Sequence, residues 1–411
     1  LILNDTIQYG LLTATRHANG RDWWILVNER FSNRIYRLLF SPSGIQKLDS
    51  QHVNIALIDG LGQAAFSPNG EYYAIKSSYG LSVGHSLDVF RFNRCTGHLS
   101  EQIQIKNEGS AVGGLSFSPN SEYLYVSYRN NIFQYFLKSS NIDSSKILIA
   151  NVDPLFPSYT FNTMQLAPNN KIYICATNSM KFLHLINYPD KLGADCGFQP
   201  IGISLPTFNY ASISYSPNFR LGPIDGSICD SLGINNNPNC RWRSEQDTLD
   251  PLLMYFHDLS YFEPSEWHWN FGDPVSGFNN ISNEQHPQHL FSTNGTYQVC
   301  LSVCNANACD TLCREIKLGN SHSENPEILT QIQVTPNPFS SMLYVGNTSP
   351  LGNNNCIFRL YNQTGTLARE YKLPFGITEI DTKDLPPGMY FWNVESHMEI
   401  LRSGKIIKLN E

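Results

Sequence analysis

The pattern of hydrophobic and polar positions predicts β-strands along the whole chain. Aromatic and β-branched residues gather in short runs, as in Tyr123–Ser127, Ile132–Leu137 and Ile147–Val152. In Glu266–Phe271 apolar and polar residues alternate, which places the aromatic residues on one buried face of a strand. No window repeats its apolar residues at the 3.6-residue period of a helix. The pattern therefore predicts an all-β fold class.

A turn motif recurs about every fifty residues in the first half of the chain. It reads S-P-N-G-E-Y-Y from Ser67, S-P-N-S-E-Y-L from Ser118, A-P-N-N-K-I-Y from Ala167, S-P-N-F from Ser216 and H-A-N-G-R-D-W-W from His17. Proline fixes φ and asparagine accepts the left-handed conformation, so each motif predicts a turn between two strands. About four strands per fifty residues is the size of a β-propeller blade.

The S-P-N-G turn resembles the S-P-D-G turn of WD-repeat-like propellers. Longer stretches resemble a family of secreted propeller proteins of Bacteroidetes, namely Arg16–Trp24, Phe92–Gly97 and Leu205–Tyr210, with Arg220–Gly226 ending the array. Residues 1–226 are therefore predicted to be β-propeller blades. A closed propeller takes about four to eight blades. This chain shows about four and starts within a unit, so we expect further N-terminal blades and a signal peptide.

An asparagine- and proline-rich linker is predicted at residues 227–235, and a second domain at residues 236–319. There W-N-F-G-D and, further on, G-T-Y-Q-V resemble the polycystic-kidney-disease (PKD) repeat, an immunoglobulin-like sandwich. The chain departs from the common W-D-F-G-D-G at Asn270 and Pro274, both in a turn. The resemblance implies a spacer or a carbohydrate- or protein-binding module. Its motif residues are Trp269, Phe271, Gly272, Asp273, Gly295 and Tyr297.

Four cysteines of this domain flank a turn at Asn305–Ala308. In a hairpin centred there, Cys304 opposes Cys309 and Cys300 opposes Cys313, all on one face. Opposed Cα atoms lie about 4.5–5.5 Å apart, within reach of a disulfide. We therefore predict two disulfides. The alternative is a zinc site with four thiolates, although thiolates on one flat face do not readily converge as a tetrahedron.

The remaining cysteines give weaker pairing signals. Cys229 is predicted to pair with Cys240 near the linker, and Cys95 with Cys196 across blades. Cys175 and Cys356 are then left as buried thiols. The total of ten cysteines favours an oxidising, extracellular compartment.

A polar linker is predicted at residues 320–328 and a small β-sandwich at residues 329–411. Tyr390, Trp392 and Val394 occupy alternate positions of one strand and are predicted to point into its core.

The order of motifs here resembles the C-terminal sorting domain of the type IX (Por) secretion system of Bacteroidetes. The matching pieces are P-N-P-F, a Y-N-x-x-G turn, L-x-x-G-x-Y and a closing G-K-I-I-K-L. The resemblance implies export, with the secretion translocon and its C-terminal signal peptidase as partners, and a secreted or outer-membrane cell-surface location. The residues that carry it are Pro336, Asn337, Pro338, Gly388, Tyr390, Lys405 and Lys408.

Composition narrows the functional classes. The net charge is −7, charged residues make up 15% of the chain, and 41 asparagines supply much of its polarity. Such a chain lacks the basic field that nucleic acid requires. No apolar run approaches the roughly 20 residues of a membrane span. We therefore expect neither a nucleic-acid partner nor a membrane-spanning segment.

Catalytic and metal-binding motifs are not apparent. His17 with Asp22, and His85 with Asp88, are isolated pairs in turns, and Asp273 alone supplies too few oxygens for calcium. No catalytic residue, cofactor or metal is therefore predicted. The leading hypothesis is a non-enzymatic binding or adhesion protein whose propeller recognises an extracellular glycan or protein. The alternative is a propeller-based hydrolase or lyase acting on polysaccharide or peptide.

Overall fold

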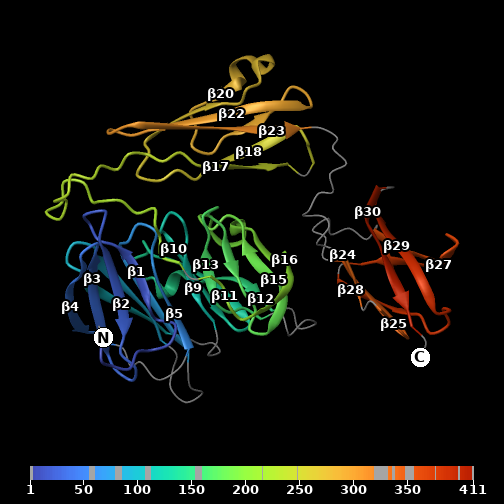
Figure 1. The fold of residues 1–411 in the computed structure, drawn as a ribbon, viewed down its shortest axis with the longest axis horizontal. Coiled ribbons are helices and arrows are strands. Elements are labelled where there is room, and N and C mark those ends of the chain that lie inside the picture. Colours follow the sequence, from blue (N-terminus) through green and yellow to red (C-terminus); the bar gives the residue numbers. More distant parts are fainter. Residues whose placement is uncertain are drawn as a thin grey trace. The chain divides into compact units, whose positions relative to one another are not determined.

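The computed structural model describes residues 3–54, 61–78, 86–106, 113–152, 160–214, 216–247, 249–318, 332–335, 338–347, 356–374, 376–396 and 399–409. The chain divides into two compact units, residues 1–319 and 320–411 (Figure 1). Both consist of antiparallel β-sheets, as the all-β prediction stated. The described 3₁₀ helices are η1 (Asp143–Ser145), η2 (Gly193–Cys196) and η3 (Pro274–Asn280).

The first half of the chain forms four antiparallel sheets of four strands each. The first sheet comprises β1 (Thr13–Arg16), β2 (Trp23–Asn28), β3 (Arg34–Ser41) and β4 (Gly44–His52), and the second β5 (Leu61–Phe66), β6 (Tyr72–Ser78), β7 (Ser86–Asn93) and β8 (His98–Lys106). The third comprises β9 (Leu115–Phe117), β10 (Tyr123–Tyr128), β11 (Asn131–Phe136) and β12 (Ile147–Asn151), and the fourth β13 (Met164–Leu166), β14 (Ile172–Ile174), β15 (Ser179–Ile186) and β16 (Phe198–Tyr210).

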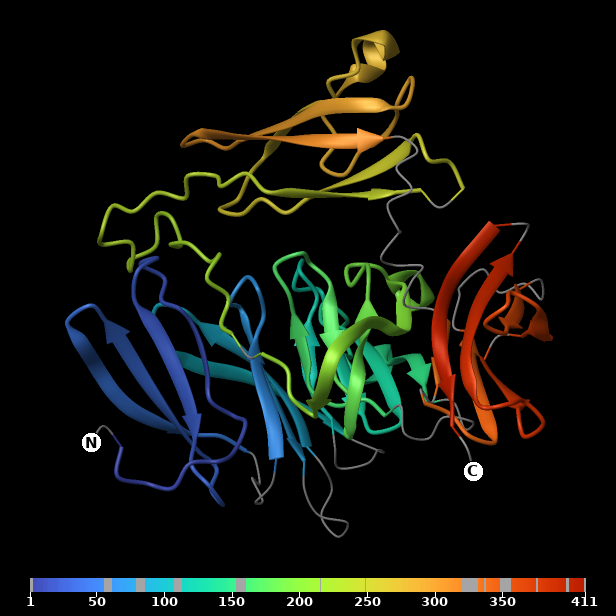
Figure 2. The same cartoon turned by 45° about the vertical axis from the view of Figure 1, so that its right-hand side comes forward.

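Within each sheet the strands neighbour one another in chain order, which is the meander of a propeller blade. Figures 1 and 2 show the four sheets side by side in the order in which the chain forms them. The four sheets are the blades of a partial β-propeller, as predicted.

Apolar side chains from facing sheets pack between adjacent blades. Trp24 and Ile35 of the first blade share one buried cluster with Tyr73 and Phe90 of the second. Similar clusters join the second blade to the third and the third to the fourth. Trp24 is 1% exposed. It is the core member of the Trp23–Trp24 pair, since adjacent strand residues point to opposite faces.

In the second and third blades the recurrent motif closes the first hairpin with the same hydrogen bonds. The Ser67 N–H donates to the Tyr72 carbonyl over 3.0 Å, and the Ser67 Oγ accepts from the Tyr72 N–H over 2.9 Å. Ser118 and Tyr123 repeat both bonds, each over 2.9 Å. The fourth motif position is left-handed in every blade, with φ of 75°, 74°, 61° and 62° at Gly20, Gly70, Ser121 and Asn170.

A buried amide ties the innermost strands of three blades together. The Gln63 Nε2 donates to the Met164 carbonyl over 2.6 Å. Its Oε1 accepts from the N–H groups of Met164 and Leu115, over 3.1 and 3.2 Å. A Cβ on Gly114 would lie 2.1 Å from the same Oε1, so the close approach requires glycine there. Strands β5, β9 and β13 are thereby held in register around the axis.

After β16 the chain returns to the first two blades instead of adding a strand. The Asn218 Nδ2 donates to the Pro68 carbonyl over 2.8 Å, and the Ile224 N–H donates to the Ala18 carbonyl over 2.9 Å. The Arg94 guanidinium donates to the Gly222 carbonyl. This return segment, residues 211–230, crosses the turn side of the blades and brings Cys229 to the second blade.

The structure corrects two predicted cysteine pairs. Cys229 is bonded to Cys95, with a Cα–Cα distance of 5.7 Å, and not to Cys240. Cys196 and Cys240 are free and buried, as are Cys175 and Cys356. The physical reason is the path of the return segment, which places Cys229 beside the β7–β8 turn that holds Cys95. Cys196 lies in the core between the third and fourth blades.

Two sheets pack face to face in the remainder of the first unit. One comprises β17 (Trp242–Gln246), β18 (Leu253–Asp258) and β21 (Gln288–Leu290); the other comprises β20 (Ile281–Ser282), β19 (Glu266–Asn270), β22 (Gly295–Cys304) and β23 (Cys309–Leu318). Their shared core contains Trp242, Phe256, Trp269, Phe271 and Tyr297. This immunoglobulin-like sandwich, β17–β23, agrees with the predicted burial of Trp269 and Phe271.

The β22–β23 hairpin carries the two disulfides on its solvent-facing side. Its register pairs Cys300 with Cys313 and Cys304 with Cys309. Both pairs are bonded, with Cα–Cα distances of 4.0 and 4.1 Å. These are the pairs predicted from the sequence, and the cross-strand distances are shorter than the expected 4.5–5.5 Å. The same four thiolates are therefore not zinc ligands in this structure.

The second unit is a separate small sandwich. One sheet comprises β24 (Ile332–Thr335), β25 (Met342–Asn347) and β28 (Gly376–Asp381); the other comprises β27 (Leu367–Leu373), β26 (Cys356–Tyr361), β29 (Gly388–Ser396) and β30 (Glu399–Lys408). Tyr390, Trp392 and Val394 of β29 are buried in its core, as their alternation predicted. The predicted linker at residues 320–328 lies outside the described residues.

Candidate binding site

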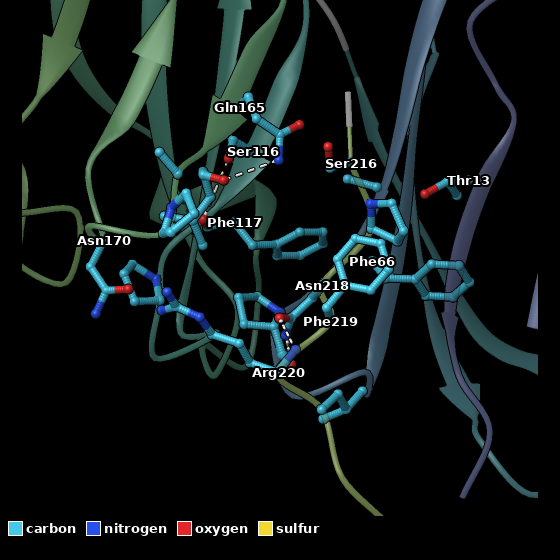
Figure 3. A pocket seen from close by; sticks show the side chains of 18 of the residues that line it. Thr13, Phe66, Ser116, Phe117, Gln165, Asn170, Ser216, Asn218, Phe219 and Arg220 are labelled. Carbon is cyan, nitrogen blue, oxygen red and sulfur yellow. Dashed lines mark hydrogen bonds between the residues drawn. The ribbon is translucent and has the colours of Figure 1, made fainter. Parts of the chain in front are cut away.

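A cavity of about 1740 Å³ lies on the turn side of the partial propeller. Its floor comes from the inner strands of the blades, with Thr13, Gln63, Ser116 and Gln165. The recurrent turns, the second half of β16, the return segment and residues 259–263 of the sandwich form its walls. Figure 3 shows Ser116, Phe117 and Gln165 on one side, Thr13 and Phe66 on the other, and Asn218–Arg220 between them.

The lining is mostly aromatic and neutral-polar. Aromatic rings are contributed by Phe66, Phe117, Phe208, Tyr210, Phe219 and Tyr261. Amide and hydroxyl groups are contributed by Asn69, Asn120, Asn170, Gln165, Ser214 and Ser216. Such a surface combines apolar faces with scattered hydrogen-bonding groups, which is the usual make-up of a small-molecule site.

The ionised groups of the lining are few. The carboxylates among the described lining residues are Glu71 and Glu263, and no histidine is among them. Glu71 is 3.1 Å from Arg91, which neutralises it. Two arginines, Arg94 and Arg220, are the lining's cations. The described lining therefore carries two carboxylates and two guanidinium groups.

Arg94 is held rigidly by backbone carbonyls. Its Nε donates to the Arg16 carbonyl over 3.0 Å, and its Nη2 donates to the carbonyls of His17 and Gly222. Burial lowers the pKa of Arg94 to about 10. Its role is to join the first two blades to the return segment.

The sandwich is fixed against the fourth blade by an ion-pair network around Glu245 of β17. The carboxylate of Glu245 lies 2.7 Å from the Lys171 Nζ, accepts from the Tyr188 hydroxyl over 3.1 Å and also pairs with Arg243. Burial by itself raises the pKa of Glu245, but the bonds from His257 and Lys171 and the charge of Arg243 outweigh it and lower that pKa strongly. Lys171 and Tyr188 belong to the blade, so the network spans both folds.

The predicted PKD motif residues shape the sandwich rather than a reactive centre. Gly272 has φ of 69°, and a Cβ there would lie 2.5 Å from the Gln298 carbonyl oxygen. The Asp273 carboxylate accepts from the Ser292 N–H and hydroxyl over 2.8 and 2.6 Å. Burial raises the pKa of Asp273, but these bonds and the contact with His289 outweigh it, and the net pKa is lowered. The Tyr297 hydroxyl donates to the Thr293 carbonyl over 2.7 Å, and Gly295 begins β22.

The predicted sorting residues are likewise structural. The Tyr390 hydroxyl donates to the Pro386 carbonyl over 2.7 Å, and Gly388 begins β29. The buried Lys408 donates to the Ser340 carbonyl, and its Nζ lies 5.7 Å from the Phe339 ring centroid. Lys405 is exposed on β30, Pro338 is exposed beside Phe339, and Pro336 and Asn337 lie outside the described residues.

The histidine–aspartate pair considered at a propeller turn is part of the scaffold. The His17 Nε2 lies 3.0 Å from the Cys95 carbonyl oxygen, and Asp22 accepts from the Asn19 side chain over 2.8 Å. His85 of the other pair lies outside the described residues. Across the described ranges, no group of three His, Cys, Asp or Glu side chains is placed to hold a metal ion.

Sequence reasoning did not identify Arg220, Tyr210 or Phe219 as site residues. Their segments were recognised as parts of the repeat, but only the folded path brings them to one cavity. A usable signal was present, because Phe208 and Tyr210 are aromatic residues two positions apart, on the same face at the end of a strand, where a core role is not required.

Family comparisons assign two parts of the chain. Residues 252–318 match the PKD domain, and residues 333–408 match the secretion system C-terminal sorting domain. None of the curated proteins matches the chain. In the described part of the chain, no helix has the length and apolar character needed to cross a membrane.

Solved structures show weak similarity. The PKD1 domain of Vibrio anguillarum Epp is 23% identical over 21% of this chain and 96% of that one, with a TM-score of 0.18. PorZ, an essential surface component of the type IX secretion system of Porphyromonas gingivalis, is 12% identical over 97% of this chain and 44% of that one, with a TM-score of 0.31. A putative TolB from Agrobacterium tumefaciens is 13% identical over 75% and 82%, with a TM-score of 0.34.

The two family matches agree with the motifs found in the sequence and with the folds that the matched residues adopt. The chain carries a PKD domain and a type IX secretion C-terminal sorting domain, and it is an exported protein of the cell surface or the surrounding medium.

Proposed function

We propose that the chain is a non-enzymatic extracellular binding protein and that the turn-side cavity of its partial propeller is the recognition site. The observation that carries this proposal is the lining of the cavity, where exposed aromatic rings and neutral amides outnumber ionised groups. Rings and amides bind by shape and hydrogen bonding, and neither a phenylalanine ring nor a side-chain amide acts as a general acid or base at neutral pH.

The competing hypothesis, a hydrolase or lyase, requires several acid–base groups that converge on one substrate atom. Glu71 and Glu263 are the two described carboxylates of the lining, and Glu71 is paired with Arg91. One free carboxylate is too few for the paired-carboxylate chemistry of glycoside hydrolysis. The lining therefore supports binding better than turnover.

The PKD domain has a supporting role in this proposal. Its residues 259–263 form part of the cavity wall, and the Glu245 network fixes β17 to the fourth blade. The Asn305 Nδ2 also donates to the carbonyls of Asn236 and Phe262, over 2.6 and 3.0 Å. We propose that the domain holds the site in shape, instead of acting as a loose spacer.

The test is direct binding of the purified, oxidised chain to arrayed glycans and peptides. Ser216→Trp fills the cavity from an exposed wall position, and Ser43→Trp places the same side chain on an exposed turn outside it. We expect Ser216→Trp to reduce binding at least about tenfold and Ser43→Trp to leave it unchanged. Turnover of an array ligand by the unmodified chain, lost in Ser216→Trp, would favour the enzyme instead.

A further inference from the structure

Arg220 is a half-buried cation without an anionic partner. Its guanidinium carbon lies 5.3 Å from the centroid of the Tyr261 ring, and its backbone N–H donates to the Asn218 Oδ1 over 2.9 Å. Among the described residues, no carboxylate or carbonyl accepts a hydrogen bond from the guanidinium itself. Figure 3 places Arg220 beside Asn218 and Phe219 in the cavity wall. Its donors are therefore available to a ligand in the cavity that Arg220 lines.

Three other partly buried arginines of the first unit have protein acceptors for their guanidinium groups. The Arg37 Nε donates to Asp49 over 2.9 Å, and Arg243 pairs with Glu245. Arg94 uses three backbone carbonyls. A polar group that is removed from water without a partner is destabilising, so folded chains usually pair such groups. Arg220 differs from these three because its guanidinium lines the cavity and contacts only the Tyr261 ring, which leaves its donors available to a ligand.

The electrostatics around Arg220 favour an anion. Burial lowers the pKa of Arg220, the contact with Tyr261 raises it, and the nearby charge of Arg241 lowers it further. An anionic group would relieve both the desolvation and the repulsion between the two cations. Of the two lining carboxylates, Glu71 is already paired with Arg91, and Glu263 acts on Arg94.

Exposed aromatic rings lie on the wall of the same cavity. Tyr210 is 76% exposed and Phe219 is 60% exposed, and both line the cavity. Both rings lie in the same lining as Arg220, so one ligand can contact all three side chains. A flat ring presents a surface against which the C–H face of a sugar ring packs well, and a tyrosine adds a hydroxyl for hydrogen bonding.

We propose that the cavity binds a saccharide bearing a carboxylate, with the guanidinium of Arg220 on the carboxylate and with Tyr210 and Phe219 against the sugar rings. The inference rests on the proposed binding function and names its ligand class. The planar fork of arginine matches a carboxylate with two parallel hydrogen bonds, which a lysine does not reproduce.

An acidic peptide is the other ligand that an arginine would attract. A peptide would gain from an open strand edge or from a row of backbone partners. The lining instead offers side-chain amides, hydroxyls and exposed rings. These groups suit the many hydroxyls and the apolar faces of a saccharide, so the observations favour the saccharide.

The experiment uses calorimetry with oligogalacturonate, oligomannuronate and sialyllactose, each compared with a neutral counterpart in which the carboxyl group is methyl-esterified or absent. The variants are Arg220→Met, Arg220→Lys and Tyr210→Ala. Arg129→Met is the matched control, because Arg129 is exposed and lies outside the cavity lining. Circular dichroism and melting confirm that each variant is folded.

We expect at least one carboxylated sugar to bind, and its neutral counterpart to bind at least about tenfold more weakly. Arg220→Met should raise the Kd about 10- to 100-fold, which is the range for a charge-assisted hydrogen-bonded pair. Arg220→Lys should recover only part of the affinity, Tyr210→Ala should weaken binding, and Arg129→Met should change nothing.

Each contrary result has a distinct meaning. Equal binding of charged and neutral sugars, unaffected by Arg220→Met, overturns this inference and leaves the proposed binding function standing. Binding of acidic peptides alone, dependent on Arg220, overturns the saccharide assignment. Failure of the folded chain to bind any sugar or peptide in the cavity contradicts the proposed function itself.

Discussion

Replacing Glu245 by glutamine should weaken the junction between the propeller and the PKD domain. The substitution keeps the size of the side chain but removes the charge that faces Lys171, Arg243 and His257. Lys171 and Arg243 are each 16% exposed in their side chains, so the variant leaves two largely buried cations without their anion. Loss of one member of such a group destabilises more than loss of the whole group would.

The expected magnitude follows from the degree of burial. Glu245 is 24% exposed, between the surface pairs that contribute about 0.2–1 kcal/mol and the buried pairs whose disruption costs about 3–5 kcal/mol. We expect a loss of about 2 kcal/mol in the free energy of unfolding. For a unit of this size that is a decrease of about 4 °C in Tm.

The pH dependence gives a second readout with a defined sign. The folded pKa of Glu245 lies below its ordinary value of 4.5. The stabilisation is therefore complete above pH 4.5 and is lost as the pH falls toward the folded pKa. The difference in Tm between the unmodified chain and Glu245→Gln should accordingly shrink as the pH falls below 4.5.

The assay is calorimetric melting of both proteins at a series of pH values. Glu315→Gln is the control, because Glu315 is 59% exposed and pairs with an exposed lysine, and its Tm should stay within about 2 °C. A double-mutant cycle with Lys171→Met should give a coupling of about 1 kcal/mol across the junction. A Glu245→Gln protein that melts with the unmodified chain at pH 7 would refute the role assigned to the network.

Three further outcomes are expected. Burial lowers the pKa of His184 from 6.5 to about 4. The free energy of unfolding of the unmodified chain should therefore decrease by about 3 kcal/mol as the pH falls from 6.5 to 4. The His184→Asn variant should melt with a flatter pH profile, and equal profiles would contradict this prediction. A Cys95→Ser, Cys229→Ser double variant removes a disulfide that spans 134 residues and should lower the free energy of unfolding by about 5 kcal/mol. Removing the Cys304–Cys309 disulfide, which spans 5 residues, should lower it by about 2 kcal/mol. Equal losses in urea unfolding would exclude the loop-entropy account. Deleting residues 329–411 should leave the chain in the periplasm, as measured by fractionation and surface labelling, and normal surface display would contradict the sorting role.

Features set by local chemistry were predictable from the sequence. The recurrent turn is one, because its proline, asparagine and left-handed fourth position determine the backbone within four residues. The register of the β22–β23 hairpin is another, because a turn of known length fixes every opposed pair, including Cys300 with Cys313. In both cases the interacting residues are close in sequence, so their spacing along the chain determines which of them face each other.

Features set by the path of the chain were not predictable. The Cys95–Cys229 bond and the Asn218–Pro68 contact join residues that are 134 and 150 positions apart. Both depend on the return segment crossing the blades, and its composition does not reveal that route. The importance of Arg220 is hidden for a related reason. An arginine becomes informative only when its surroundings prove to lack an acceptor, which a sequence does not display.

The contacts of the PKD domain change the role expected of it. A spacer needs only its own core, yet here β18 leads directly into residues 259–263, which line the cavity. Strand β17, which pairs with β18, is the strand that Glu245 fixes to the fourth blade. Displacement of β17 would therefore move a wall of the proposed binding site. It follows that Glu245→Gln should weaken ligand binding as well as lower Tm, even though Glu245 does not line the cavity.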